Sequence, residues 1–380
     1  MKQDLFVYLP SEIFIDILLR LTLKNISTSK CVCKPWLSLI ESDAFLKSQL
    51  SKSTPALAVS IPTSDSNWFS IFKLEDEYKH EHKQDPIIKF DFPQASTIQG
   101  SANGLLLLKN PFSNHLYVCN PITREYVDLR GSLTRPWGDC YGFGVSKISG
   151  RHKVVYLNPK SGCHVYTLET GSSWRAVEVA APSFYRCYSS IGAFVSGNLH
   201  WLVSNKGEGP YDWEMSYVCC FDLETERFST FSTPPRKRIG FKGKLYALGE
   251  YLCFCDDEPY FYDNFIWLLK EREHGEKCWS EVQVIMKEPD YGFFVIIEDL
   301  YYGSDAYKRL QPIKVYSNGD MLMFWHEKRF IYYSKETGNV TEIGLFGKMD
   351  DDCYYINSIL LTPSFLSLKR NLGMENVISF

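Results

Sequence analysis

The sequence predicts two parts: a small all-helical module at the N-terminus and an all-β body arranged as a propeller of about six four-stranded blades. Two patterns support this division. Within the first 50 residues, apolar side chains recur at helical spacing, whereas from Ser51 onward short strand-like runs alternate with Gly, Asn, Asp and Pro. These runs repeat with a period of about 50 residues, which is typical of propeller blades. A chain of 380 residues is long enough for one large and one small domain.

The first helix is expected to begin at Pro10 and Ser11, which supply a fixed φ and a capping hydroxyl. Ile13, Ile17 and Leu21 follow at i, i+4 and i+8 and therefore lie on one helical face. Two further apolar residues are expected to widen this stripe: Phe14 and Leu18.

Two more helices are expected before residue 50, which makes three in all. Ser27 or Thr28 would cap the second, whose apolar row again has helical spacing: Val32, Trp36 and Ile40. Ser42 or Asp43 would cap a short third helix through two apolar residues: Phe45 and Leu46. Modules below about 40 residues are rarely stable alone, so we interpret the remaining apolar surface as a docking face.

These helical residues resemble an F-box, the segment that docks a substrate receptor onto the Skp-type adaptor of a cullin-based ubiquitin ligase. The similarity spans residues 5–48 and is carried by the following positions: Leu9-Pro10, Ile13, Ile17-Leu18, Leu21, Lys24, Cys31-Val32-Cys33-Lys34, Trp36, Leu39-Ile40 and Phe45. The resemblance implies that the adaptor is bound by these residues: Leu9, Pro10, Ile13, Ile17, Leu18, Leu21, Val32, Cys33 and Trp36.

Three positions depart from the usual F-box pattern. Asp16 stands in place of a Glu, Thr22 in place of a common Pro, and Ser29 in place of a frequent aromatic residue. The departures bear on the affinity for the adaptor. A generic amphipathic helical hairpin is the alternative interpretation of this segment.

The β body is built from one recurring unit, an inner hairpin formed on a glycine and an outer hairpin with a polar turn. The clearest units begin at four glycines: Gly104, Gly197, Gly243 and Gly319. A less regular copy covers residues 153–179, and residues 55–100 supply a candidate sixth unit. The strand-like segment 357–363 is expected to close the ring against an N-terminal strand. A twisted β-sandwich is the alternative architecture.

This body resembles the F-box-associated interaction domain of plant F-box proteins, a kelch-like repeat region, over residues 90–346. The segments that carry the resemblance are GLLLL with CNPITREY, YGFGVS, and GNLHWLV with CFDLETERF. The expected domains are an F-box at 1–50, a joint and probable first blade at 51–100, the propeller at 101–365 and a tail at 366–380.

Composition narrows the possible partners. The net charge of −4 gives no electrostatic reason to expect nucleic acid or an anionic membrane. The N-terminus does not resemble a signal peptide, and the twelve cysteines do not form zinc-type CxxC pairs. We therefore expect reduced thiols and a cytoplasmic or nuclear location.

Motifs for catalysis are not recognisable. The sequence contains no GxxxxGK[ST], no GxSxG and no HExxH motif, and Gly142-Phe143-Gly144 lacks the context of a dinucleotide site. His80 and His82 lie in a charged stretch that is typical of a solvated loop. The prediction is a non-catalytic chain without a cofactor or a metal.

The predicted function is the substrate-recognition subunit of an SCF-type (Skp–cullin–F-box) ubiquitin ligase, in which the propeller recruits an unidentified target protein. Aromatic residues in loops are the candidate target contacts: Trp137, Tyr185, Tyr211, Trp213, Tyr301 and Tyr302. Two alternatives remain. One is a propeller enzyme or lectin with an incidental helical N-terminus, and the other is an F-box interaction protein that acts outside a ligase.

Overall fold

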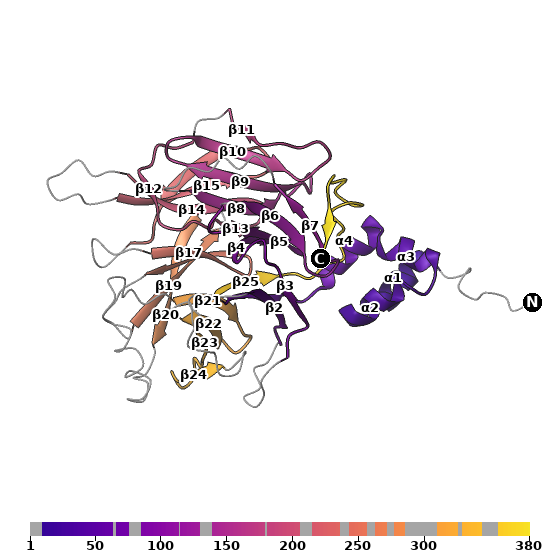
Figure 1. Ribbon diagram of the computed structural model, residues 1–380. Helices are drawn as coiled ribbons and strands as arrows, with labels where there is room; N and C mark the ends of the chain where they lie inside the picture. Colours follow the sequence, from indigo (N-terminus) through magenta and orange to yellow (C-terminus); the bar gives the residue numbers. More distant parts are fainter. Residues whose placement is uncertain are drawn as a thin grey trace, which may run out of the picture.

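In the computed structural model, four helices lie beside a ring of six β-sheets (Figure 1). The structure describes residues 10–63, 66–75, 85–113, 115–129, 139–178, 181–205, 215–235, 243–256, 263–271, 277–285, 310–325, 329–343 and 356–380. The propeller of six blades that was predicted from the repeats is thus confirmed, and the β-sandwich alternative is wrong.

The described helices are α1 (Ser11–Leu19), α2 (Leu23–Ser29), α3 (Lys34–Ile40) and α4 (Asp43–Lys52). The Thr22 hydroxyl caps α2 by accepting a hydrogen bond from the Asn25 N–H at 3.3 Å. The Ser42 hydroxyl does the same for α4, where it accepts from the Phe45 N–H at 3.2 Å. Side chains of this type at the residue before a helix satisfy donors that the helix itself leaves free.

The prediction of three helices is wrong, because α2 begins at Leu23, ahead of the expected second helix, and ends at Ser29. The expected row of Val32, Trp36 and Ile40 lies in the following turn and in α3. Cys33 between α2 and α3 is extended, with φ −160° and ψ 162°. Pro35, in the first turn of α3, has no N–H to donate and is favoured at a helix start. Neither expected cap, Ser27 or Thr28, caps a helix: both lie within α2, which is capped by Thr22, and the N-cap residue of α3 is Cys33.

Each blade is one antiparallel sheet. Blade I contains β25 (Asn357–Leu361), β1 (Ala56–Pro62), β2 (Asn67–Lys73) and β3 (Ile88–Asp91). Blade II contains β4 (Thr97–Ala102), β5 (Leu105–Lys109), β6 (Leu116–Asn120), β7 (Glu125–Asp128) and β26 (Ile378–Ser379). Blade III contains β8 (Cys140–Val145), β9 (His152–Asn158), β10 (Gly162–Thr167) and β11 (Arg175–Ala176).

The other three blades follow in chain order. Blade IV contains β12 (Arg186–Cys187), β13 (Ala193–Val195), β14 (Asn198–Asn205), β15 (Met215–Asp222) and β16 (Phe228–Ser232). Blade V contains β17 (Gly243–Leu248), β18 (Tyr251–Asp256), β19 (Asp263–Glu271) and β20 (Lys277–Ile285). Blade VI contains β21 (Leu310–Val315), β22 (Met321–Trp325), β23 (Arg329–Tyr333) and β24 (Val340–Ile343).

Blade I joins the two ends of the β body. Strand β25 pairs antiparallel with β1, with Leu57 opposite Leu360 and Ala56 opposite Leu361. This pairing confirms that segment 357–363 returns to an N-terminal strand. The ring therefore closes by hydrogen bonds between strands that are about 300 residues apart in the chain.

A hydrophobic cluster fills each interface between neighbouring blades. In β5, for example, Leu105 and Leu107 contribute to the cluster shared with blade III, whereas Leu106 and Leu108 contribute to the cluster shared with blade I. Side chains alternate between the faces of a strand, and both faces of a blade are covered by its neighbours. This double burial explains why the strands contain continuous apolar runs.

Candidate functional site

Helix α1 divides its apolar side chains between two faces. Leu18, with 1% of its surface exposed, packs with Ile15 in the core that joins the helices to blades II and III. Ile13 and Ile17 are 45% and 47% exposed, and Leu21 just beyond the helix is also exposed. We call Ile13, Ile17 and Leu21 the docking stripe. The spacing of four residues places Ile13 and Ile17 one above the other on the surface of α1, and Leu21 follows just after the helix ends.

The segment between α2 and α3 presents a further exposed apolar residue, Val32, at 63% exposure. Cys33 beside it is also exposed. Trp36 in α3 is partly buried, and its ring centroid lies 6.3 Å from that of Phe14 in a T-shaped contact. This contact connects α3 to α1, so that Trp36 helps to hold the exposed residues in place.

The structure thus sorts the predicted adaptor-binding residues into three groups. Those on the surface are Pro10, Ile13, Ile17, Leu21, Val32 and Cys33. Trp36 is partly buried and Leu9 lies outside the described residues. Leu18 is in the core, because it follows Ile17 by one residue and so points about 100° away around the helix. We therefore assign Leu18 to packing instead of docking.

Charged side chains fix α1 against α4. The Asp16 carboxylate accepts hydrogen bonds from Lys52 Nζ at 2.8 Å and from Arg20 Nη2 at 2.7 Å. These two cations lower the pKa of Asp16. Lys52 is the last residue of α4, so the pair ties the two ends of the helical module together.

Of the predicted target contacts, Tyr185 is described and is 61% exposed. Its backbone N–H donates to the Ser204 carbonyl at 2.8 Å, which holds the residue next to β14 while its ring faces outward. The remaining predicted contacts lie outside the described residues: Trp137, Tyr211, Trp213, Tyr301 and Tyr302.

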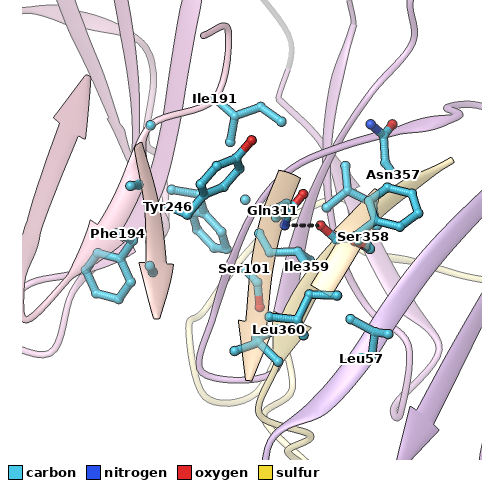
Figure 2. A pocket seen from close by; sticks show the side chains of 18 of the residues that line it. Leu57, Ser101, Ile191, Phe194, Tyr246, Gln311, Asn357, Ser358, Ile359 and Leu360 are labelled. Atoms are coloured by element: carbon cyan, nitrogen blue, oxygen red, sulfur yellow. Dashed lines mark hydrogen bonds between the residues drawn. The ribbon is translucent and has the colours of Figure 1, made fainter. Parts of the chain in front are cut away.

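A cavity of about 480 Å³ lies where the innermost strands of the ring meet (Figure 2). Its lining is largely apolar, with Ile191, Tyr246 and Ile359 around it. The Gln311 side-chain N–H donates to the Ser358 carbonyl at 3.3 Å and so links β21 to β25. Within the described lining, the ionisable side chains are one lysine and one tyrosine. The cavity therefore offers mainly apolar contact and a few hydrogen-bonding groups.

Buried thiols account for most of the described cysteines. Burial raises the pKa of the Cys163 thiol to about 12 and also raises that of Cys119. Such thiols stay protonated at neutral pH and are poor nucleophiles and metal ligands. Where the structure is described, no three His, Cys, Asp or Glu side chains gather as a metal site.

The sequence did not reveal the residues that join the helices to the ring, chiefly Glu41, Gln49 and Arg370. These are polar residues without a local pattern, and the two residues of each pair lie more than 300 positions apart in the chain.

Among the helices that the structure describes, none has the length and apolar character of a membrane span.

Known families match both parts of the chain. The F-box domain matches residues 6–48, and the F-box associated beta propeller domain matches residues 56–301. The chain is 29% identical over 295 residues to F-box protein At5g65850 from Arabidopsis thaliana, a match that covers 74% of this chain and 71% of that protein.

Two further relatives come from the same plant. Putative F-box protein At1g33530 is 27% identical over 73% of this chain and 62% of its own length. Putative F-box protein At3g52320 is 27% identical over 85% of this chain and 84% of its own length. The chain belongs to the family of F-box proteins that carry an F-box associated beta propeller domain.

Proposed function

We propose that this chain is the substrate-recognition subunit of an SCF-type ubiquitin ligase and performs no catalysis itself. Its F-box binds a Skp-type adaptor and, through the adaptor, a cullin scaffold. Its propeller recruits a target protein. Ubiquitin transfer is then favoured because the target is held near the conjugating enzyme at a high effective concentration.

One observation carries this proposal: the helical module leaves the docking stripe exposed while its other side is buried in the protein's own core. Burying one isoleucine side chain contributes about 1.5–3 kcal/mol. Ile13 and Ile17 are each about half exposed, so covering both would contribute roughly 1.5–3 kcal/mol together. Fixed apolar residues on a rigid helix are what a hydrophobic docking site requires.

The test is a titration of the purified chain with a Skp-type adaptor after co-expression and size-exclusion chromatography. We expect a one-to-one complex. The double variant Ile13→Glu/Ile17→Glu should weaken binding by roughly 100-fold or more, because two buried apolar contacts are lost. The matched control is Ile148→Glu, in the β8–β9 turn, where the isoleucine is 87% exposed on the ring.

Thermal unfolding of each variant checks that the fold is retained, since all three side chains lie on the surface. Equal adaptor affinity for the double variant and the parent would refute the docking assignment. A parent chain that does not bind the adaptor would refute the ligase role altogether. Tyr185→Ala, which removes an exposed ring from blade IV, should leave adaptor affinity unchanged and weaken target capture.

A further inference from the structure

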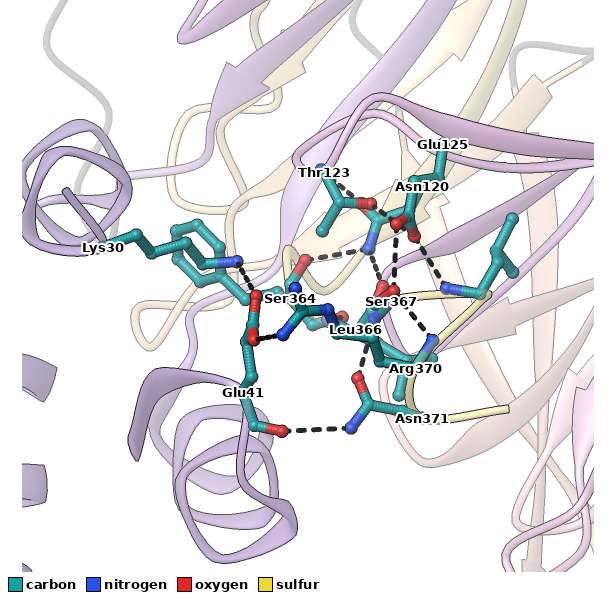
Figure 3. A network of polar contacts seen from close by, with 12 residues as sticks. Lys30, Glu41, Asn120, Thr123, Glu125, Ser364, Leu366, Ser367, Arg370 and Asn371 are labelled. Carbon is teal, nitrogen blue, oxygen red and sulfur yellow. Dashed lines mark hydrogen bonds and ion pairs between the residues drawn. The ribbon is translucent and has the colours of Figure 1, made fainter. Parts of the chain in front are cut away.

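A polar cluster joins the helices to the C-terminal segment, by which we mean residues 362–377 (Figure 3). The Glu41 carboxylate pairs with Arg370 and lies 3.7 Å from Lys30 Nζ. The Glu41 main-chain carbonyl accepts a hydrogen bond from Asn371 Nδ2 at 3.2 Å. Glu41 follows α3 directly, so these contacts hold the point at which α3 turns into α4.

Helix α4 makes a second, buried contact with the same segment. Gln49 is 2% exposed, and its side-chain oxygen accepts a hydrogen bond from the Phe365 N–H at 3.1 Å. Around this contact, apolar residues of the segment belong to the core that contains Phe45 and Leu46 of α4: Phe365, Leu366, Leu368 and Met374. The helices and the segment therefore share one continuous hydrophobic core.

The other side of the segment is anchored to blade II. The Asn120 side-chain N–H donates to the carbonyls of Ser364 and Leu366, at 3.0 and 2.7 Å. The Ser364 hydroxyl donates to the Asn103 carbonyl at 2.7 Å, in the turn between β4 and β5. Gly104 in that turn has φ +88°, and a Cβ there would clash with Ser364 Oγ.

Glu125 in β7 provides a second anchor. Its two carboxylate oxygens accept hydrogen bonds from the Ser367 hydroxyl at 2.9 Å and from the Leu368 N–H at 2.8 Å. Further along, the Thr170 hydroxyl of blade III donates to the Gly373 carbonyl at 2.6 Å. The segment is thus tied to two blades and to the helices at once.

We propose that the C-terminal segment is a bracket that fixes the orientation of the F-box helices relative to the propeller, with Arg370 and Gln49 as positioning residues. The direct link between α4 and β1 consists only of Ser53, Thr54 and Pro55. One short link leaves rotation possible, whereas a second attachment through the bracket prevents it. The functional meaning rests on the proposed ligase role, because a rigid receptor presents its target at a constant distance from the conjugating enzyme.

The test measures a distance distribution between two spin labels in the full-length chain. One label is placed by Lys47→Cys on α4 and the other by Ile148→Cys on blade III, both exposed positions. The exposed native thiols Cys31 and Cys33 are replaced by serine, and labelling stoichiometry verifies that two sites react. We expect a single narrow distribution.

The bracket variant is Arg370→Glu/Gln49→Met, which sets two carboxylates against each other and removes the acceptor of the Phe365 N–H. We expect at least about a twofold broader distribution with the propeller still folded, because a constrained orientation becomes an ensemble. Arg370→Lys with native Gln49 should restore the narrow distribution. The matched control is Arg151→Glu, which disrupts an ion pair on blade III whose arginine side chain is as exposed as Arg370, at 61%.

A broad distribution in the parent, or an unchanged one in the bracket variant, would overturn the proposal. Adaptor titration of the unlabelled parent and bracket variant, in which Cys31 and Cys33 are native, separates this outcome from the proposed function. Loss of the narrow distribution with unchanged adaptor affinity supports the bracket. A narrow distribution in a chain that does not bind adaptor leaves the bracket valid and refutes the ligase role.

Discussion

At the scale of single residues, two buried histidines make the stability of the ring depend on pH. His152 in β9 is buried beside Phe143, and His200 in β14 lies 3.2 Å from the Ala193 carbonyl. Burial lowers the pKa of each imidazole to about 4. A low dielectric disfavours the charged form, and the unfolded chain does not impose this cost.

We therefore expect the free energy of unfolding to fall as the pH drops from about 6.5 to about 4, because the unfolded state binds more protons over that range. The loss should be on the order of 2 kcal/mol for each histidine between pH 7 and pH 5, and should level off below the folded pKa. Urea unfolding of the parent and of His152→Gln measures it. In the variant, the free energy of unfolding should depend less on pH. An unchanged slope of this free energy against pH would show that His152 does not contribute to the pH dependence.

At the scale of secondary-structure elements, the turns between strands depend on glycine for two separable reasons. Gly104 has a positive φ and is also crowded, because an added Cβ would clash with Ser364 Oγ and lie 2.8 Å from the Ser364 backbone nitrogen. Gly162 has a positive φ of +80° and no atom within 4 Å of that position. Comparing substitutions at Gly104 and Gly162 therefore separates the cost of backbone strain from the cost of a steric clash.

Gly162→Ala should cost about 1–2 kcal/mol of unfolding free energy, which is the strain of a left-handed alanine. Gly104→Ala should cost roughly 1–3 kcal/mol more, because the backbone nitrogen of Ser364 cannot rotate away. Denaturant unfolding of both variants gives the comparison. Equal costs would mean that the bracket shifts easily at this contact.

At the scale of the whole molecule, closure of the ring depends on β25, the strand that the C-terminal part of the chain adds to blade I. Strand β25 contacts β1 by five residue pairs, and Leu361 in it is fully buried. Without β25, the backbone groups of β1 and the apolar side chains packed on it would be exposed. Strand β26, by contrast, adds two residue pairs at the outer edge of blade II.

A chain that ends at residue 355 should therefore lose cooperative unfolding, since an open ring exposes a hydrophobic edge. A chain that ends at residue 377 is the control and should keep a cooperative transition at a lower midpoint. Circular dichroism during thermal unfolding, with light scattering to detect association, measures both. Equal midpoints for the two truncations would contradict closure by β25.

The sequence alone determined the features that depend on near neighbours in the chain. Helical spacing was sufficient to place Ile13 and Ile17 on one face of α1, because residues four apart share one helical face. The repeated glycine turns and apolar runs were sufficient to predict six blades, because each blade is a local meander of hairpins. Helix α2 was missed, since its seven residues, Leu23–Ser29, contain two apolar side chains, too few to form a helical row.

Tertiary structure decided the rest. Leu18 was placed in the core and Ile17 on the surface by what packs against α1, although both are apolar and adjacent in the sequence. The pairing of Glu41 with Arg370 joins residues 329 positions apart. No local pattern encodes such a pair, because it forms only after closure of the ring has brought the C-terminal segment back beside the helices.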